Sequence, residues 1–337
     1  MNYAGIDLHK ESITVCVMNQ ERKIVIEKKL ICSEEERILK FFISLGEYEA
    51  VVEATSSYEW LVKLLEPSAH RVILAHPKKL RVIAESVKKS DKLDARVLAE
   101  FLALGMIPEA HRPLPRQRDH RVLVRHRAKI QGRITSVKCR IRNMLARYNA
   151  DRKNLFTPAG RKYLREYGLS KEDRYSIDLM EKELEFFEEQ FKAINARLKE
   201  FAKKAPIREK EARALLKTIP GVGEVTINVV VAEAGDMSRF RSAKKLVDYA
   251  GLAPGYRSSA GKSKELGITK EGSGLMRWAL TEAAWSAVRH SSRWRRVFER
   301  LAKRRGRKKA IVAVARHLLC VMHSMLQAGQ KYNLAAA

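Results

Sequence analysis

The sequence predicts a mixed α/β part at the N-terminus followed by a mainly helical remainder. Three observations lead to this fold class. Short apolar strands alternate with helical segments through the first 110 residues, apolar residues recur every three or four positions through the middle, and the last third contains apolar helical stretches around glycine-rich turns. We therefore expect three parts, residues 1–110, 111–206 and 207–337.

The first part opens with three successive short strands, YAGIDLH, SITVCVMN and KIVIEKKLIC. A helix follows over residues 33–46, with Ser33 as its expected N-cap. After it come the strand YEAVVEAT, the helix SYEWLVKLLEP, the strand RVILAHP and helices over about 77–87 and 91–105. The order βββαβαβα, with three strands before the first helix, is that of an RNase H-like fold.

Four carboxylates lie at positions where this fold gathers acids. Asp7 is inside the first strand, Glu53 ends the fourth, and Asp91 and Asp94 are three apart on a helix and share a face. Carboxylates in a strand interior are costly unless a cation compensates them. Oxygen ligands without His or Cys favour Mg²⁺ or Mn²⁺ over zinc. Taken singly, Asp7 could be a strand-edge residue, and the helical pair an N-cap and a first-turn acid.

The middle part contains a strict heptad pattern. Apolar residues occur in steps of three and four from Ile177 to Phe201, and a basic stretch from Ile130 to Tyr148 behaves in the same way. Two such helices, joined by a segment around residues 149–170, predict an antiparallel coiled-coil hairpin. We interpret the apolar positions as packing, within one chain or between protomers. The basic outer face of the first helix, with Arg133 and Arg140, could lie along nucleic acid.

Charge is divided unevenly along the chain. The formal net charge is +28, yet residues 1–110 contain 16 basic and 17 acidic residues, so the excess lies entirely behind them. Two blocks concentrate it, residues 112–147 with 12 Lys and Arg, and residues 289–309 with 11. A charged run is commonly just a solvated face. Two such runs on so basic a chain favour contact with a nucleic-acid backbone.

The last part contains the turn IPGVG between two helical patterns. Gly221 and Gly223 give it the form of a helix-hairpin-helix turn, whose backbone N–H groups can bind phosphate without reading sequence. A plain turn between helices is the alternative.

A segment rich in Gly, Ser and Lys, residues 254–274, lies between two apolar helices and is expected to be a functional loop. Its small residues would let a serine approach phosphate closely. Arg257, Lys262 and Lys264 could stabilise the charge that develops there. With no histidine nearby, a Ser-His-Asp triad is not supported, and composition alone favours a basic DNA-binding loop as much as a nucleophile.

Other features exclude several classes of protein. The four cysteines form no CxxC pair, so neither a zinc site nor a disulfide framework is indicated. Asp7 and Lys10 interrupt any signal peptide, and no apolar run approaches the roughly 20 residues of a membrane span. We expect a cytoplasmic protein. His317, Cys320 and His323 lie three apart, and we interpret them as helix-face residues rather than a metal site.

Taken together, these motifs resemble the DEDD transposases of bacterial insertion sequences, the insertion sequence 110 family of bridge-RNA-guided recombinases. The resemblance covers nearly the whole chain. It is carried by GIDLHK with Asp7, VVEATSSY with Glu53, KSDKLDARVLAE with Asp91 and Asp94, and then IPGVG, YAGLAPG, SSAGK and GITKEGSGLMRWAL.

The resemblance implies a RuvC-like domain whose four acids bind Mg²⁺ (or Mn²⁺), a coiled-coil spacer and a C-terminal transposase domain. It further implies that DNA strands are exchanged through a covalent 5′-phosphoserine, guided by a structured bridge RNA that pairs with target and donor DNA. The assembly is expected to be a tetramer, a dimer of dimers, acting near the nucleoid and away from membranes.

By motif the nucleophile falls on Ser259, with Arg257 and Lys262 on the scissile phosphate. Ser258 is its competitor, since some relatives have one serine here and others two. Ala260 departs from the glycine of many relatives.

Two other functions are compatible with the same residues. One is a metal-only RuvC-like nuclease or junction resolvase, with water as nucleophile and the serine segment only binding DNA. The other is a non-catalytic basic nucleic-acid-binding protein. The first predicts cleavage without a covalent adduct, and the second predicts that Asp7→Ala leaves function unchanged.

Overall fold

A computed structural model describes residues 1–55, 57–83, 91–259 and 262–333. The chain divides into two compact units, Met1–Arg112 and Pro113–Ala337, each with a core of its own. The second unit includes both the long helices of the middle part and the helices of the C-terminal part. The two units are described separately below.

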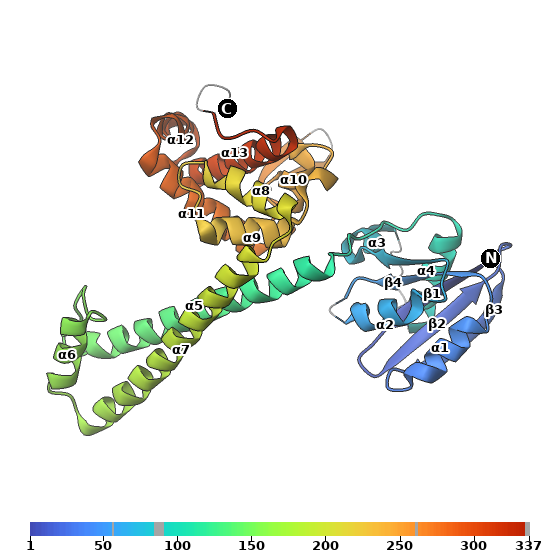
Figure 1. Ribbon diagram of the computed structural model, residues 1–337, viewed down its shortest axis with the longest axis horizontal. Helices are drawn as coiled ribbons and strands as arrows, with labels where there is room; N and C mark the ends of the chain where they lie inside the picture. Colours follow the sequence, from blue (N-terminus) through green and yellow to red (C-terminus); the bar gives the residue numbers. More distant parts are fainter. Residues whose placement is uncertain (56, 84–90, 260–261, 334–337) are drawn as a thin grey trace. The chain divides into compact units, whose positions relative to one another are not determined.

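The first unit is a five-stranded mixed sheet with helices on both faces (Figure 1). Its strands lie in the order β3-β2-β1-β4-β5, in which β1, β2 and β3 are antiparallel neighbours and β4 and β5 run parallel to β1. The elements are β1 (Asn2–Leu8), β2 (Ser12–Met18), β3 (Ile24–Ile31), α1 (Glu35–Ile43), β4 (Tyr48–Glu53), α2 (Tyr58–Leu65), β5 (Arg71–Ala75), α3 (Pro77–Ile83) and α4 (Asp91–Ala103).

Alternation along the strands separates two cores. Ala4 and Ile6 of β1 pack with Ile38, Phe42 and other residues of α1 and α2 on one face. On the other face, α4 covers Gly5 of β1 together with Cys16 and Met18 of β2. The predicted succession of strands and helices along this unit is confirmed. The N-cap prediction is wrong, because a turn after β3 places Glu34 rather than Ser33 at the start of α1.

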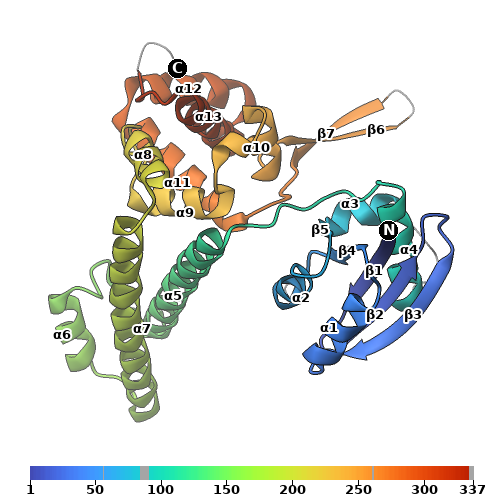
Figure 2. The same cartoon turned by 45° about the vertical axis from the view of Figure 1, so that its right-hand side comes forward.

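In the second unit, α5 (Pro115–Ala146) and α7 (Lys171–Lys203) pack side by side (Figures 1 and 2). Heptad residues from both helices, among them Ile134, Ile141, Ile177 and Leu184, form one buried core within the chain. The connecting segment contains a further helix, α6 (Pro158–Glu166), which was not predicted from the sequence. Its signal was available, because Thr157 accepts a hydrogen bond from the Gly160 backbone N–H as the N-cap and Pro158 occupies the first helical position.

The rest of the second unit is a helical domain around a large apolar core. Its elements are α8 (Ile207–Lys217), α9 (Glu224–Ala234), the 3₁₀ turn η1 (Met237–Arg239), α10 (Ala243–Tyr249), β6 (Pro254–Ser259), β7 (Lys262–Ile268), α11 (Gly274–His290), α12 (Ser292–Arg305) and α13 (Arg307–Ala328). Among the described residues, α13 alone is long and apolar enough to cross a membrane. It packs against α10, α11 and α12, so it is a core helix of this domain.

The segment expected to be a loop, residues 254–274, contains a two-stranded antiparallel hairpin instead. Figure 2 shows β6 and β7 projecting beyond α10. The loop prediction failed because Gly, Ser and Lys weaken the apolar alternation by which strands are recognised. The backbone pairing gives the hairpin its strands without that alternation.

Candidate catalytic and nucleic-acid-binding sites

Asp7 and Glu53 lie on neighbouring parallel strands, at the carboxyl end of each. The last residue pair between β1 and β4 is Ile6 with Val52, and the two acids are the next residues along. Because Ile6 and Val52 both belong to the core under α1 and α2, alternation puts Asp7 and Glu53 together on the opposite face, the one that α4 covers. The structure therefore brings these two predicted acids to one edge of one face.

The helix with the other two acids packs closely on that face. A Cβ added to Gly5 would lie 2.1 Å from the Ala95 carbonyl oxygen and 2.3 Å from the Ala99 nitrogen, so only glycine allows this approach. Asp94 precedes Ala95 directly and is exposed. Asp91 is the first residue of α4, but its side chain lies outside the described part of the structure.

The polar surroundings of Asp7 fit a cation. The carboxylate is largely buried, with 15% of the side chain exposed, and lies 2.9 Å from the His9 Nε2 atom. Thr14, paired with Asp7 on β2, has a buried hydroxyl with no hydrogen-bond partner among the described residues. In those same residues no three His, Cys, Asp or Glu side chains come together as a metal site. The donors present suit a hard divalent ion.

The predicted nucleophile lies at the end of β6. The backbone of Ser259 pairs with Lys262, that of Ser258 with Ser263, and that of Arg257 with Lys264. Ala260 and Gly261 lie outside the described residues, as do the side chains of residues 256–265. The backbone thus brings the predicted serine and the predicted cations into one short hairpin.

The glycine turn between α8 and α9 is fixed by packing. Gly221 has φ of +86°, and a Cβ there would lie 2.3 Å from the backbone nitrogen of Ala287 in α11. Gly223 is exposed and is the N-cap of α9. Glu224 follows as the first helical residue and pairs with Lys217 at 3.5 Å. The positive φ and the close approach of α11 therefore require glycine at position 221, and Gly223 is the more accessible of the two.

Arg133 and Arg140, the cations predicted on the outer face of α5, both contact α7. The Arg133 guanidinium lies 5.4 Å from the centre of the Phe187 ring, and Arg140 forms an ion pair with Glu183. Half of the Arg140 side chain is nevertheless exposed. Of the late His and Cys residues, His323 is buried with Nε2 3.0 Å from the Phe240 carbonyl oxygen, which is a core contact.

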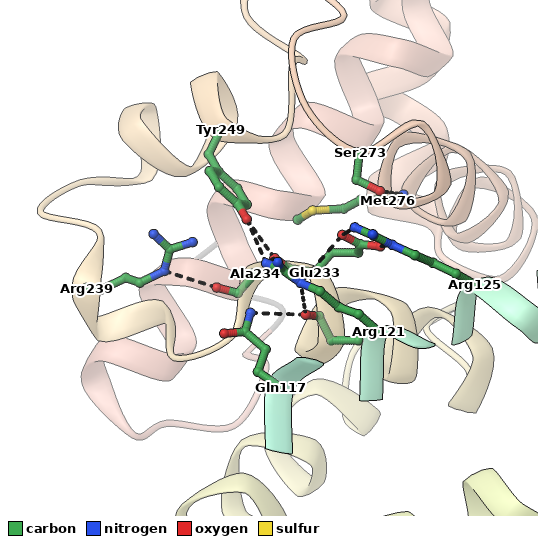
Figure 3. Close-up of polar contacts among 10 residues, drawn as sticks. Gln117, Arg121, Arg125, Glu233, Ala234, Arg239, Tyr249, Ser273 and Met276 are labelled. Atoms are coloured by element: carbon green, nitrogen blue, oxygen red, sulfur yellow. Dashed lines mark hydrogen bonds and ion pairs between the residues drawn. The ribbon is translucent and has the colours of Figure 1, made fainter. Parts of the chain in front are cut away.

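A polar junction joins α5 to the helices of the C-terminal domain (Figure 3). Arg125 donates to both oxygens of the buried Glu233 carboxylate, at 2.8 and 2.9 Å. Arg121 donates to the Glu233 and Ala232 carbonyls at 2.8 and 2.9 Å, and to the Tyr249 hydroxyl at 3.0 Å. This junction could not be predicted from the sequence, because the partners are more than 100 residues apart.

Comparison with protein-family models gives two matches. The Transposase IS116/IS110/IS902 family model matches residues 213–299, which run from α8 through the hairpin into α12. A second transposase model, that of the DEDD transposases of the same group, matches residues 4–150, from β1 to the end of α5. Both the acids and the serine hairpin therefore lie within matched regions.

Two transposases match over most of the chain, and a third relative matches over about a third of it. The transposase for insertion sequence element IS1111A of Coxiella burnetii is 24% identical over 98% of this chain and 91% of its own length. The transposase for IS1328 of Yersinia enterocolitica is 24% identical over 83% of this chain and 82% of its own length. A pilin gene-inverting protein of Moraxella bovis is 32% identical over 36% of this chain and 38% of its own.

Proposed function

Because the chain belongs to the IS116/IS110/IS902 family of transposases, enzymes that cut and rejoin DNA, we propose that it does so through a covalent phosphoserine on Ser259. The observation that carries this proposal is the presence of two sites, each within a matched region. One is the carboxylate edge of Asp7 and Glu53, and the other is the hairpin containing Ser259.

In the proposed reaction, the Ser259 hydroxyl attacks the phosphorus of a DNA phosphodiester. A bond forms between the serine oxygen and phosphorus, the bond from phosphorus to the 3′ oxygen breaks, and the serine proton is balanced by protonation of that 3′ oxygen. A 3′ hydroxyl of a second strand then attacks the phosphoserine and releases the serine. Each step exchanges one phosphodiester bond for another, so no external energy source is needed.

The four acids have a separate role in the proposed reaction, which is to bind a divalent metal ion. Asp7, Glu53, Asp91 and Asp94 would hold Mg²⁺ or Mn²⁺, which supplies charge stabilisation at the reacting phosphate when bound. The sheet order and the three leading antiparallel strands support an RNase H-like, RuvC-like fold for residues 1–110. Placing carboxylates on adjacent strands lets the fold hold them close without a long loop.

The cations would hold the substrate. Arg257, Lys262 and Lys264 would contact the scissile phosphate, and Gly223, with Gly221, would present backbone N–H groups to a neighbouring one. Arg133 and Arg140 would contact nucleic acid along α5, which we propose forms a coiled-coil spacer with α7 over residues 111–206. Residues 207–337 would form the transposase domain.

The proposal includes partners beyond DNA. A structured bridge RNA would pair with target and donor DNA, and four chains would assemble as a dimer of dimers. The enzyme would act in the cytoplasm, at the nucleoid. Net positive charge confined to the second and third parts suits the simultaneous binding of two polyanions.

The test is to incubate the purified protein with Mg²⁺, bridge RNA and end-labelled DNA, and to separate the products on a denaturing protein gel. We expect a labelled, protease-sensitive adduct that is absent in Ser259→Ala and present in Ser258→Ala. The reverse pattern would move the nucleophile to Ser258. Cleavage without any adduct in the wild type would favour a metal-only nuclease and contradict the proposal.

A further inference from the structure

A groove of about 720 Å³ lies between α5, α7, α8, α9 and α11 of the second unit. Its floor is apolar, with Val124, Leu198 and Val229 buried in the core. The volume is within the range of small-ligand sites, and roughly one or two nucleotides of a single strand fit it. None of the predicted site residues lines it.

The rim of the groove is strongly basic. Six Lys and Arg side chains line it and one carboxylate, Glu224, opposes them. The cations are Arg127, Lys199, Lys203, Lys210, Arg213 and Lys217. Arg127 and Arg213 are held by Asn195 and Asn228, at 2.7 and 3.0 Å.

Three of the lysines are available to a ligand. Lys199, Lys203 and Lys210 are exposed, and within the described part of the chain they form no hydrogen bond or ion pair. They come from α7 and α8, so they can contact successive charges of an extended anion. An apolar or basic helix in this groove would leave these lysines without counter-charge, whereas a phosphate backbone supplies one negative charge per nucleotide.

Trp278 adds an aromatic surface to this basic groove. It lies on α11 among the lining residues, and 46% of it is exposed. Of the four tryptophans, it alone is among the exposed large apolar residues of the described chain. Bases of single strands stack on such side chains, because every base presents a π face.

We propose that this groove binds an unpaired segment of DNA, with one base stacked on Trp278 and the flanking phosphates on Lys199, Lys203 and Lys210. This rests on the proposed function, because the exchange of DNA strands frees unpaired DNA. The apolar floor and the aromatic surface accept a base, and the lysines accept its backbone. A base paired within a duplex cannot reach the indole.

Fluorescence anisotropy with a labelled 12-nucleotide single-stranded DNA tests the proposal across several salt concentrations. Trp278→Ala should weaken binding about tenfold with an unchanged salt slope, and Trp278→Phe should restore most of the affinity. The triple variant Lys199→Ala, Lys203→Ala, Lys210→Ala should lower the slope of log K against log salt by about 2. Lys182→Ala, an exposed lysine of α7 outside the groove, is the matched control and should bind as wild type.

Binding of two further ligands, duplex DNA and RNA, shows whether single-stranded DNA binds in this groove or on another surface. A duplex of the same sequence should bind Trp278→Ala within about twofold of wild type, because its bases are already stacked. Wild-type affinity of Trp278→Ala for the single strand, or equal losses for single strand and duplex, would overturn the proposal. So would tighter binding of the matching RNA, which would assign the groove to RNA.

The covalent adduct distinguishes this inference from the proposed function. If the groove variants bind single strands normally while the wild type forms the phosphoserine adduct, the groove assignment fails and the proposed chemistry stands. If the groove variants lose single-strand binding while no adduct forms, the chemistry fails and the groove remains a single-strand site. Thermal unfolding of each variant checks that the second unit is folded.

Discussion

Arg125 of α5 and Glu233 of α9 form a two-point ion pair, with nitrogen–oxygen distances of 2.8 and 2.9 Å. The Glu233 side chain is 3% exposed and the Arg125 side chain is 54% exposed. Loss of the pair would therefore leave a buried charge on Glu233, whereas water would still solvate Arg125. Since α5 also belongs to the helix pair with α7, this pair ties that helix pair to the C-terminal domain.

Glu233→Gln should destabilise the second unit by about 2 kcal/mol, because the amide cannot accept both charged hydrogen bonds within a buried site. Urea unfolding followed by tryptophan fluorescence measures this, since Trp278, Trp285 and Trp294 all lie in the second unit. The control is Glu183→Gln, which breaks the more exposed pair with Arg140 and should cost less than about 1 kcal/mol. Equal losses in both variants would contradict the special role of the buried pair.

Gly5→Ala should detach α4 from the sheet. The new methyl group would overlap the backbone of Ala95 and Ala99, so the helix must move, at a cost of about 3 kcal/mol. Hydrogen–deuterium exchange of peptides from residues 1–112 reports unfolding of the first unit, and DNA cleavage should fall with it because α4 contains Asp91 and Asp94. Gly132→Ala is the control: nothing lies within 4 Å of its Cβ, and alanine favours the helix by up to about 1 kcal/mol. A stable, active Gly5→Ala would show that α4 does not pack on Gly5.

Acid should destabilise the second unit through His120. Burial, and then the charge of Arg213, lower the pKa of His120 to about 4 from 6.5. Between pH 6.5 and about 4, the His120 imidazole is protonated in the unfolded chain but not in the folded chain. Protonation therefore favours the unfolded chain, and the stability present above pH 6.5 is lost as the pH falls toward 4. The full contribution is about 3 kcal/mol. Unfolding free energies of the wild type and of His120→Gln, measured at pH 7 and 4.5, test this prediction. The variant should lose less stability than the wild type between the two pH values. Equal losses in both proteins would show that His120 is not the group responsible.

The basic helix α12 should contact duplex DNA. It has seven Lys and Arg residues and one acid, Glu299, and Arg296, Arg300 and Arg304 are exposed at a spacing of four. Replacing these three by alanine should lower the salt slope of duplex binding by about 3, since each phosphate contact contributes about 0.9. Binding titrations from 50 to 200 mM salt measure it. Glu299→Gln, on the same helix, is the control and should not lower the salt slope. An unchanged salt slope in the triple variant would show that duplex DNA does not bind to α12.

The elements with strong periodicity could be predicted from the sequence. The strands of the first unit and the helices α5 and α7 follow from alternation and from the heptad positions, because burial of an apolar face determines both. The β6–β7 hairpin could not, because its pairing lies in backbone hydrogen bonds and its composition is polar. Likewise Ser33 is a good cap by type, but the turn after β3 places the helix start one residue later.

The sites divide in the same way. Asp7 and Glu53 could be assigned to one site in advance, because the predicted order of elements is that of a fold that gathers acids at these positions. The partners of Glu233 and the groove around Trp278 could not, since their residues come from five helices and meet only through tertiary packing. Exposure of a tryptophan is a property of the folded chain.

Identification of the residue bound to DNA tests the central claim most directly. Trypsin cleaves after Arg257 and Lys262, so the peptide Ser-Ser-Ala-Gly-Lys contains both candidate serines. After nuclease trimming of the adduct, fragmentation by mass spectrometry places the nucleotide on one residue. We predict a 5′-phosphate-linked nucleotide on Ser259. A nucleotide on Ser258, or cleaved DNA with no nucleotide on this peptide, would contradict the account.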